Sequence, residues 1–192
     1  APSDPESITA AAQAHRVTHV ILGPDVPLAA GAVDALREAG IKAVGPDSSS
    51  ARLESSKQFS KAFMRRNKVP TAESVEITSV SVLQEELAAR KGKVVLKKSG
   101  LAAGKGVLES DNPAELTSFA EKVLAEDSLI LEEFLSGYEI SLFALLDGSS
   151  YRLLPPCADF KKAGVEDSGP NTGGMGSICP VPTVSGGMLE EI

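Results

Sequence analysis

A glycine-rich loop between two short apolar runs constrains this sequence more than any other feature. The loop occupies residues 100–106 and reads Gly-Leu-Ala-Ala-Gly-Lys-Gly, with the apolar runs at 93–98 and 107–109. Both runs are short and rich in β-branched residues, so the loop is expected to join two strands. Glycine lets the backbone approach a phosphate closely, and Lys97 and Lys105 could supply positive charge beside it.

The spacing of the loop points away from two common nucleotide motifs. A Walker A loop has Ser or Thr after its lysine and opens a helix, whereas Gly106 follows Lys105 here. The pattern GxGxxG does not occur in the sequence, so dinucleotide binding has no direct support. A lysine-bearing loop between two strands indicates another class of ATP site.

The composition is typical of an α/β protein and argues against some classes of binding partner. Of 192 residues, 42% are hydrophobic and 4% aromatic, without Trp, which favours a core of Ala, Val and Leu. The net charge of -7 argues against a general affinity for nucleic acid or for an anionic membrane, and no apolar run approaches the roughly 20 residues of a membrane span. Cys157 and Cys179 lack metal-site spacing and are interpreted as buried or incidental thiols in a reducing cytosol. We therefore expect a cytoplasmic protein.

The two ends of the sequence indicate an internal fragment of a longer protein. The chain begins without Met or a secretory signal pattern, and residues 188–192 read as a helix that has barely begun. We expect the longer parent protein, rather than this piece alone, to carry a complete active site.

Short helices and strands alternate along the first third of the sequence. The expected elements are helices over 7–14, 29–39 and 49–67 and strands over 17–22 and 41–44. This order, with short loops, predicts parallel βα units in a partial Rossmann-like layer.

The rest of the sequence reads as a small mixed unit followed by strands and a long loop. Strands are expected over 73–77, 93–97, 107–109, 128–134, 140–146 and 151–154, and helices over 80–89 and 113–125. From Pro155 to Pro182 the sequence is rich in Gly, Pro and Asp and is expected to be a loop.

Two further segments could recognise ligands. At the strand end 132–135, free backbone groups could pair with adenine, and a downstream carboxylate such as Glu139 could accept hydrogen bonds from ribose. Residues 167–176 contain four glycines, with small hydroxyl side chains between them. Ordering so many glycines costs conformational entropy, so we expect this segment to bind an anionic or polar substrate through its backbone amides and hydroxyls. The plain alternatives are a solvated acidic strand end and a flexible surface loop, and Lys57 taken alone reads as a solvated helical lysine.

In this order, the segments resemble the ATP-grasp superfamily and, within it, the glycinamide ribonucleotide synthetase family of purine biosynthesis. The resemblance spans nearly the whole chain. It rests on residues 23–31, 45–46, 51–57, 94–97, 100–107, 132–135 and 169–176. The glycine loop and the run Gly-Pro-Asn-Thr-Gly-Gly-Met-Gly resemble this ligase specifically among ATP-grasp enzymes.

The resemblance implies an α/β fold, with a partial Rossmann-like (pre-ATP-grasp) domain followed by a partial ATP-grasp fold. Residues 1–72 would be the C-terminal part of the first domain plus a linker helix. Residues 73–135 would form the ATP-grasp lid subdomain, and residues 136–192 the truncated start of the core subdomain.

The resemblance also implies an activity, the ATP-dependent ligation of glycine to 5-phosphoribosylamine. The products would be glycinamide ribonucleotide, ADP and phosphate, formed through a glycyl phosphate intermediate. The cofactors would be ATP and Mg²⁺ or Mn²⁺, the partners would be small molecules rather than nucleic acid or membrane, and the full-length form would be a monomer. The fragment itself would be inactive.

Site roles follow only for positions that match the family's motifs. The ATP-binding residues would be Lys57, Lys97, Gly104, Lys105, Gly106, Glu132, Leu135 and Glu139. The substrate-binding residues would be Gly23, Pro24, Asp25, Asp159, Asn171, Thr172, Gly173, Gly174 and Met175. No residue is assigned a covalent catalytic role, and the metal ligands are expected beyond Ile192.

Three positions depart from the family pattern. Asp25 stands where the family usually has Glu, and Ser99 stands where it has Asp two residues after the strand lysine. Its Gln-Asp-His-Lys-Arg stretch becomes residues 158–162, in which Phe160 replaces the imidazole and Asp159 is kept.

Three alternatives stay open. Another ATP-grasp carboxylate–amine ligase or carboxylase would share the nucleotide residues but use another acid, and the run at 169–176 argues against it. A non-catalytic nucleotide-binding module would bind ATP without glycine-dependent turnover. A plain structural βα fragment would bind no nucleotide.

Overall fold

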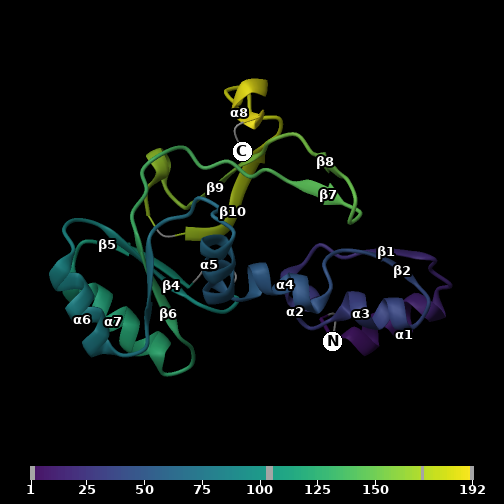
Figure 1. Cartoon of the computed structure of the whole chain (residues 1–192), viewed down its shortest axis with the longest axis horizontal. Coiled ribbons are helices and arrows are strands. Elements are labelled where there is room, and N and C mark those ends of the chain that lie inside the picture. Colours follow the sequence, from purple (N-terminus) through teal and green to yellow (C-terminus); the bar gives the residue numbers. More distant parts are fainter. Residues whose placement is uncertain (1–2, 103–105, 170, 191–192) are drawn as a thin grey trace. The chain divides into compact units, whose positions relative to one another are not determined.

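The computed structural model describes residues 3–102, 106–169 and 171–190. These residues form two compact units, and the chain passes from the first to the second after Phe134. Figure 1 traces the elements along the chain. None of the helices in the described part of the chain has the length and apolar character needed to span a bilayer.

The first unit opens with a small parallel sheet. Strands β1 (His19–Ile21) and β2 (Lys42–Val44) pair in parallel, and helices α1 (Pro5–Ala14), α2 (Asp25–Ala29) and α3 (Ala32–Glu38) accompany them. Leu36 and Val33 of α3 are fully buried in two adjoining clusters of apolar side chains. The predicted helix over 29–39 begins only at Ala32, because Gly31 adopts a left-handed φ of 87° and separates it from α2.

The predicted helix over 49–67 is wrong, since the structure has two helices there, α4 (Ser48–Ser55) and α5 (Lys57–Arg66). Ser56 separates them with an extended backbone (φ -137°, ψ 102°), and its hydroxyl accepts a hydrogen bond from the N–H of Phe59. The hydroxyl thus caps α5. The N–H of Lys57 donates to the carbonyl of Ser99 at 3.0 Å, which ties the start of α5 to the end of a strand in the next sheet.

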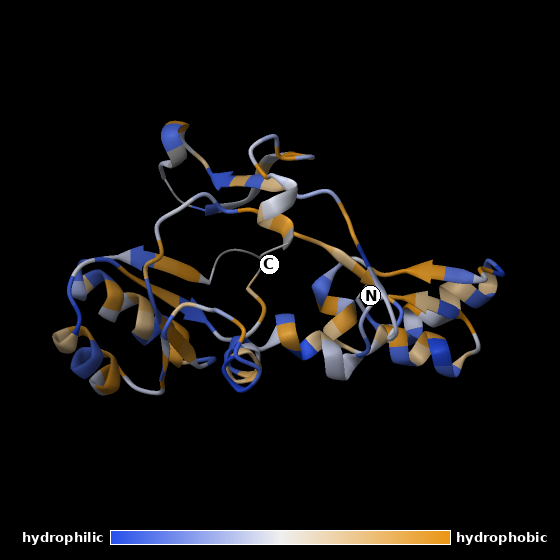
Figure 2. Ribbon diagram, turned by 45° about the horizontal axis from the view of Figure 1, so that its top comes forward, coloured by the Kyte–Doolittle hydropathy of each residue, from blue (hydrophilic) through white to orange (hydrophobic). Residues whose placement is uncertain are grey.

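Four strands of the described chain form the larger sheet of the first unit. They are β3 (Ser74–Ile77), β4 (Val94–Lys98), β5 (Val107–Ser110) and β6 (Leu129–Glu133), antiparallel in the order β3-β6-β4-β5. Helices α6 (Val80–Ala89) and α7 (Pro113–Leu124) pack on one face. Apolar residues occupy much of these strands (orange in Figure 2), and Leu96, Leu129 and Leu131 are fully buried against the two helices.

The second unit is built from short strands. A hairpin of β7 (Ala144–Leu146) and β8 (Tyr151–Leu153) precedes an antiparallel pair of β9 (Ala158–Lys162) and β10 (Asn171–Ile178). A 3₁₀ turn, η1 (Val165–Asp167), lies between β9 and β10, and α8 (Gly186–Glu190) follows.

Two predictions for the second unit are wrong. The predicted loop from Pro155 to Pro182 contains β9 and β10, because an antiparallel ladder uses backbone groups that glycine supplies as well as any other residue. The predicted strand over 140–146 is shorter and begins at Ala144. Ahead of it, Ser141 pairs with Cys157 as an isolated bridge.

Candidate functional site

Two oppositely charged side chains meet on the face of the larger sheet opposite α6 and α7. Val95 lies directly across from Glu132, and Lys97 lies across from Ile130. Side chains on a strand alternate between faces, so Lys97 and Glu132 share one face as diagonal neighbours. Nζ of Lys97 approaches Oε2 of Glu132 to 2.7 Å. The register of β4 and β6 therefore fixes a lysine beside a buried carboxylate.

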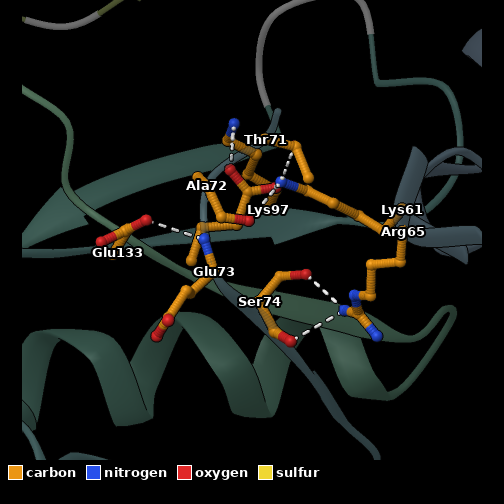
Figure 3. A network of polar contacts seen from close by, with 9 residues as sticks. Lys61, Arg65, Thr71, Ala72, Glu73, Ser74, Lys97 and Glu133 are labelled. Carbon is orange, nitrogen blue, oxygen red and sulfur yellow. Dashed lines mark hydrogen bonds and ion pairs between the residues drawn. The ribbon is translucent and has the colours of Figure 1, made fainter. Parts of the chain in front are cut away.

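A second lysine, Lys61 of α5, reaches the same carboxylate. Its Nζ lies 3.2 Å from Oε1 of Glu132 and donates to the hydroxyl of Thr71 at 2.7 Å and to the carbonyl of Ala72 at 2.9 Å. These contacts and that of Lys97 are drawn in Figure 3. The side chains of Lys61 and Glu132 are 9% and 6% exposed, whereas that of Lys97 is 31% exposed. Two cations thus share one carboxylate, and the one that solvent reaches is Lys97.

Lys61 was not among the predicted site residues. A lysine in a helix ordinarily reads as solvated, and its buried partner comes from a strand far along the sequence. The available signal was helical spacing, because Lys57 and Lys61 are four residues apart and share one face of α5. Gln58 donates to Ser128, the residue before β6, and Arg65 donates to Ser74 of β3, so this face of α5 contacts the sheet.

Lys57, the first residue of α5, lies close to the predicted phosphate loop. Its Nζ donates to the carbonyl of Gly100 at 3.2 Å. Burial lowers the pKa of Lys57 below its ordinary value of 10.5, Glu54 acts against this shift, and the Lys97 cation adds to it. The structure therefore brings the two predicted phosphate lysines within electrostatic reach of each other. An anion between them would relieve their repulsion.

Both ends of the glycine loop are held by specific contacts. The N–H of Gly100 donates to Oδ2 of Asp127 at 3.0 Å, and the N–H of Lys98 donates to the carbonyl of Gly106 at 2.7 Å. A Cβ on Gly106 would lie 2.5 Å from Cβ of Ala102 and 2.9 Å from Cβ of Lys98. Glycine at 106 is therefore required by close packing at the base of the loop.

The hydrogen bonds described above do not test the predicted roles of two loop residues or of the adenine-binding strand end. Gly104 and Lys105 lie outside the described residues. Glu132 belongs to β6, whereas Leu135 is 64% exposed at the start of the second unit. Their backbone contacts with adenine stay a prediction.

In the second unit, Lys161 of β9 forms ion pairs with two carboxylates. Its Nζ forms an ion pair with Oε1 of Glu139 and lies 3.7 Å from Oδ1 of Asp159. The hydrogen bond with Glu139 raises the pKa of Lys161, while burial acts in the opposite direction and Asp159 adds to the rise. Glu139, the predicted ribose acceptor, is thus already paired with a lysine that sequence reasoning did not assign.

A large bulge in β10 gathers the remaining predicted substrate residues beside this lysine. Asn171 pairs with Lys162 and Gly176 with Phe160, so four residues of β10, 172–175, oppose Lys161 alone. The hydroxyl of Thr172 donates to the carbonyl of Lys161 at 2.9 Å and accepts the N–H of Gly174 at 3.0 Å.

Few side chains cover the backbone of the bulge. A Cβ on Gly173 or Gly174 would meet no atom within 4 Å, and Met175 is 63% exposed. The structure thus brings Asp159 and residues 171–175 together around an open stretch of backbone.

The segment Gly23-Pro24-Asp25 follows the parallel strand β1 at its carboxyl end. Asp25 is exposed and is the first residue of α2. Ligands of open α/β sheets bind at the carboxyl ends of parallel strands, so the position suits a binding role. Among the described residues, no group of three or more His, Cys, Asp or Glu side chains is arranged to hold a metal ion.

Comparison with known proteins yields consistent matches. The family model for the phosphoribosylglycinamide synthetase ATP-grasp (A) domain matches residues 55–192, and that for the N domain of the same synthetase matches residues 1–54. A phosphoribosylamine–glycine ligase of Streptomyces coelicolor is 44% identical over 189 residues, which are 98% of this chain and 45% of the ligase.

Solved structures agree with the sequence matches. The phosphoribosylamine–glycine ligase of Thermotoga maritima is similar with a TM-score of 0.66 at 35% identity, covering 73% of this chain and 38% of that one. A biotin carboxylase of Campylobacter jejuni is similar in fold, with a TM-score of 0.71 at 18% identity over 82% of this chain and 38% of its own. The predicted α/β fold class, with a partial ATP-grasp fold, is confirmed, and the matched residues cover less than half the length of each of these three proteins.

Proposed function

Because this chain belongs to the phosphoribosylglycinamide synthetase family, we propose that its complete protein joins glycine to 5-phosphoribosylamine at the expense of ATP. In this proposal the protein acts in purine biosynthesis as a cytoplasmic monomer. The observation that carries the proposal is the cluster formed by Lys57, Lys97 and the glycine loop, with Lys97 held on a buried carboxylate.

The chemistry of this cluster fits a polyphosphate. Lys97 is partly exposed, and Nζ of Lys57 donates to the loop carbonyl of Gly100. Charge-assisted contacts from ammonium groups to phosphate oxygens are among the stronger hydrogen bonds in proteins. We assign Lys57 and Lys97 to the ATP phosphates and residues 104–106 to the loop over them.

The reaction asks little covalent work of side chains. The glycine carboxylate attacks the γ-phosphate of ATP, ADP leaves, and the amine of phosphoribosylamine then displaces phosphate from glycyl phosphate. Positioning and charge neutralisation dominate such phosphoryl transfers, which is the work that the lysines perform. A divalent ion, Mg²⁺ or Mn²⁺, would neutralise further phosphate charge when bound.

The second unit is assigned to the acceptor substrates. Asp159 and residues 171–175 supply a carboxylate, two small polar side chains and an open glycine backbone, which suit the amine and hydroxyls of a small polar substrate. We place Gly23, Pro24 and Asp25 at the ribosyl phosphate. Phe160, 46% exposed, replaces an imidazole of the family pattern.

The test is an assay of the full-length protein with ATP and magnesium or manganese. ADP release that requires both glycine and 5-phosphoribosylamine supports the proposal. Release with another carboxylic acid in place of glycine would assign the protein to a related ligase. ATP binding without turnover would contradict an enzymatic role.

A further inference from the structure

Cys157 precedes β9 and Cys179 follows β10, so the two cysteines of the chain flank the same end of this antiparallel pair. Asp159 faces Ser177 and Ala158 faces Ile178 in the antiparallel register. Continued by one position, this register would set Cys157 against Cys179. Directly opposed residues of antiparallel strands have Cα atoms about 4.5–5.5 Å apart, within the roughly 4.4–6.8 Å that a disulfide spans.

The thiols converge on a single acceptor. Sγ of Cys157 lies 3.4 Å from the carbonyl oxygen of Pro155, and Sγ of Cys179 lies 3.8 Å from the same oxygen. A hydrogen bond with the Cys179 thiol, together with some burial, raises the pKa of Cys157. Cys179 is exposed, whereas Cys157 is partly covered. One thiol is therefore open to reagents and the other stands beside it.

The backbone around the pair is held in place. Cys157 exchanges two hydrogen bonds with Ser141, at 2.7 and 2.9 Å, and the N–H of Val181 donates to the carbonyl of Pro156. Ala158 and Val181 are buried. Since the fold already brings the two cysteines together, closing a bond between them costs little further chain entropy.

We propose that Cys157 and Cys179 form a reversible disulfide across the end of the β9–β10 pair. The oxidant is a small-molecule disulfide such as oxidised glutathione. The Cys179 thiolate attacks one sulfur of the oxidant and releases one thiol. The Cys157 thiolate then attacks Sγ of Cys179 in the mixed disulfide and releases the second thiol.

The step balances without another reagent. Two electrons pass from the protein dithiol to the oxidant, and the two thiol protons end on the released thiols. The inference does not rest on the proposed enzymatic function, because it uses only the register and the thiol contacts.

The experiment equilibrates the purified protein with graded ratios of oxidised and reduced glutathione, followed by alkylation, trypsin digestion and mass spectrometry. Lys161 and Lys162 lie between the cysteines, so cleavage there leaves the Cys157 and Cys179 peptides joined only by the disulfide. The same titration in denaturant gives the reference. We expect the native protein to favour the bridge at least about tenfold over the denatured chain.

Single variants C157S and C179S provide the matched controls. Each is expected to give no joined peptides and to carry one glutathione on the remaining cysteine. Wild-type protein that carries glutathione on the cysteines without a bridge would overturn the inference. A native equilibrium no more favourable than the denatured one would overturn it as well, and this comparison needs no variant.

Discussion

Nζ of Lys97 lies 2.7 Å from Oε2 of Glu132, a carboxylate that strand β6 keeps almost wholly out of solvent. The same carboxylate has a second cation, Lys61, on its other oxygen. Glu132 therefore orients Lys97 without neutralising the cluster completely. The remaining positive charge is available to an anion from solvent.

Lys97→Ala is expected to weaken ATP binding to the full-length protein by about 1.5–3 kcal/mol, because a charge-assisted phosphate contact is lost. Calorimetric titration with ATP measures the effect. Lys91→Ala is the matched control, since Lys91 is exposed in the loop before β4. Equal affinities for wild type and Lys97→Ala would remove Lys97 from the phosphate site.

Lys61→Met is expected to lower the free energy of unfolding of the first unit by about 1–3 kcal/mol, because buried polar partners of the lysine lose a hydrogen bond while Lys97 still compensates Glu132. The change also leaves Thr71 and Ala72 without their cation donor. Urea denaturation followed by circular dichroism provides the measurement. Lys122→Met on the exposed side of α7 should change the midpoint little, and equal midpoints for both variants would contradict the structural role of Lys61.

Gly106→Ala is expected to destabilise the base of the glycine loop, with a cost of about 1–3 kcal/mol from overpacking. The added methyl group would meet Ala102 and Lys98 at distances that side chains do not tolerate. Gly186→Ala is the control, since a Cβ there meets no atom within 4 Å. Amide hydrogen exchange of β4 and β5 reports the difference, and unchanged protection in Gly106→Ala would show that the loop base adapts freely.

Replacing Lys57 with an apolar residue is expected to stabilise the protein by an amount that depends on pH. The pKa of Lys57 is lowered in the folded protein from 10.5, so the unfolded chain binds more protons in the interval between the two values. The penalty for burying the charged lysine is full below the folded pKa and disappears as pH rises toward 10.5. Lys57→Met should therefore gain stability relative to wild type at neutral pH and lose that gain in alkali. A stability difference between Lys57→Met and wild type that stays constant up to pH 10.5 would contradict the lowered pKa of Lys57.

The larger sheet could be predicted because its strands are short apolar runs separated by turn residues. The helix over 80–89 matches α6, and the glycine loop joins β4 and β5 as expected. Lys97 could be proposed from its place at the end of a strand before that loop. These features depend on local sequence alone.

The features that were missed depend on contacts between distant segments. Ser56 interrupts a helical pattern where the N–H of Lys57 donates to the carbonyl of Ser99, the residue after β4. Lys61 is buried because it forms an ion pair with Glu132 of β6. The β9–β10 pair forms from backbone ladders in a stretch whose glycine content is typical of a loop. No local pattern carries such information.

Strand β6 comes last of the four along the chain, yet it lies between β3 and β4. During synthesis, β4 and β5 can pair as soon as both have emerged, whereas β3 has no neighbour until Leu129–Glu133 arrive. At about 5–20 residues per second, that delay lasts on the order of seconds. For that time the nascent chain carries an unpaired strand with free backbone groups, so ribosome-bound intermediates that end before β6 expose a strand open to pairing with another chain.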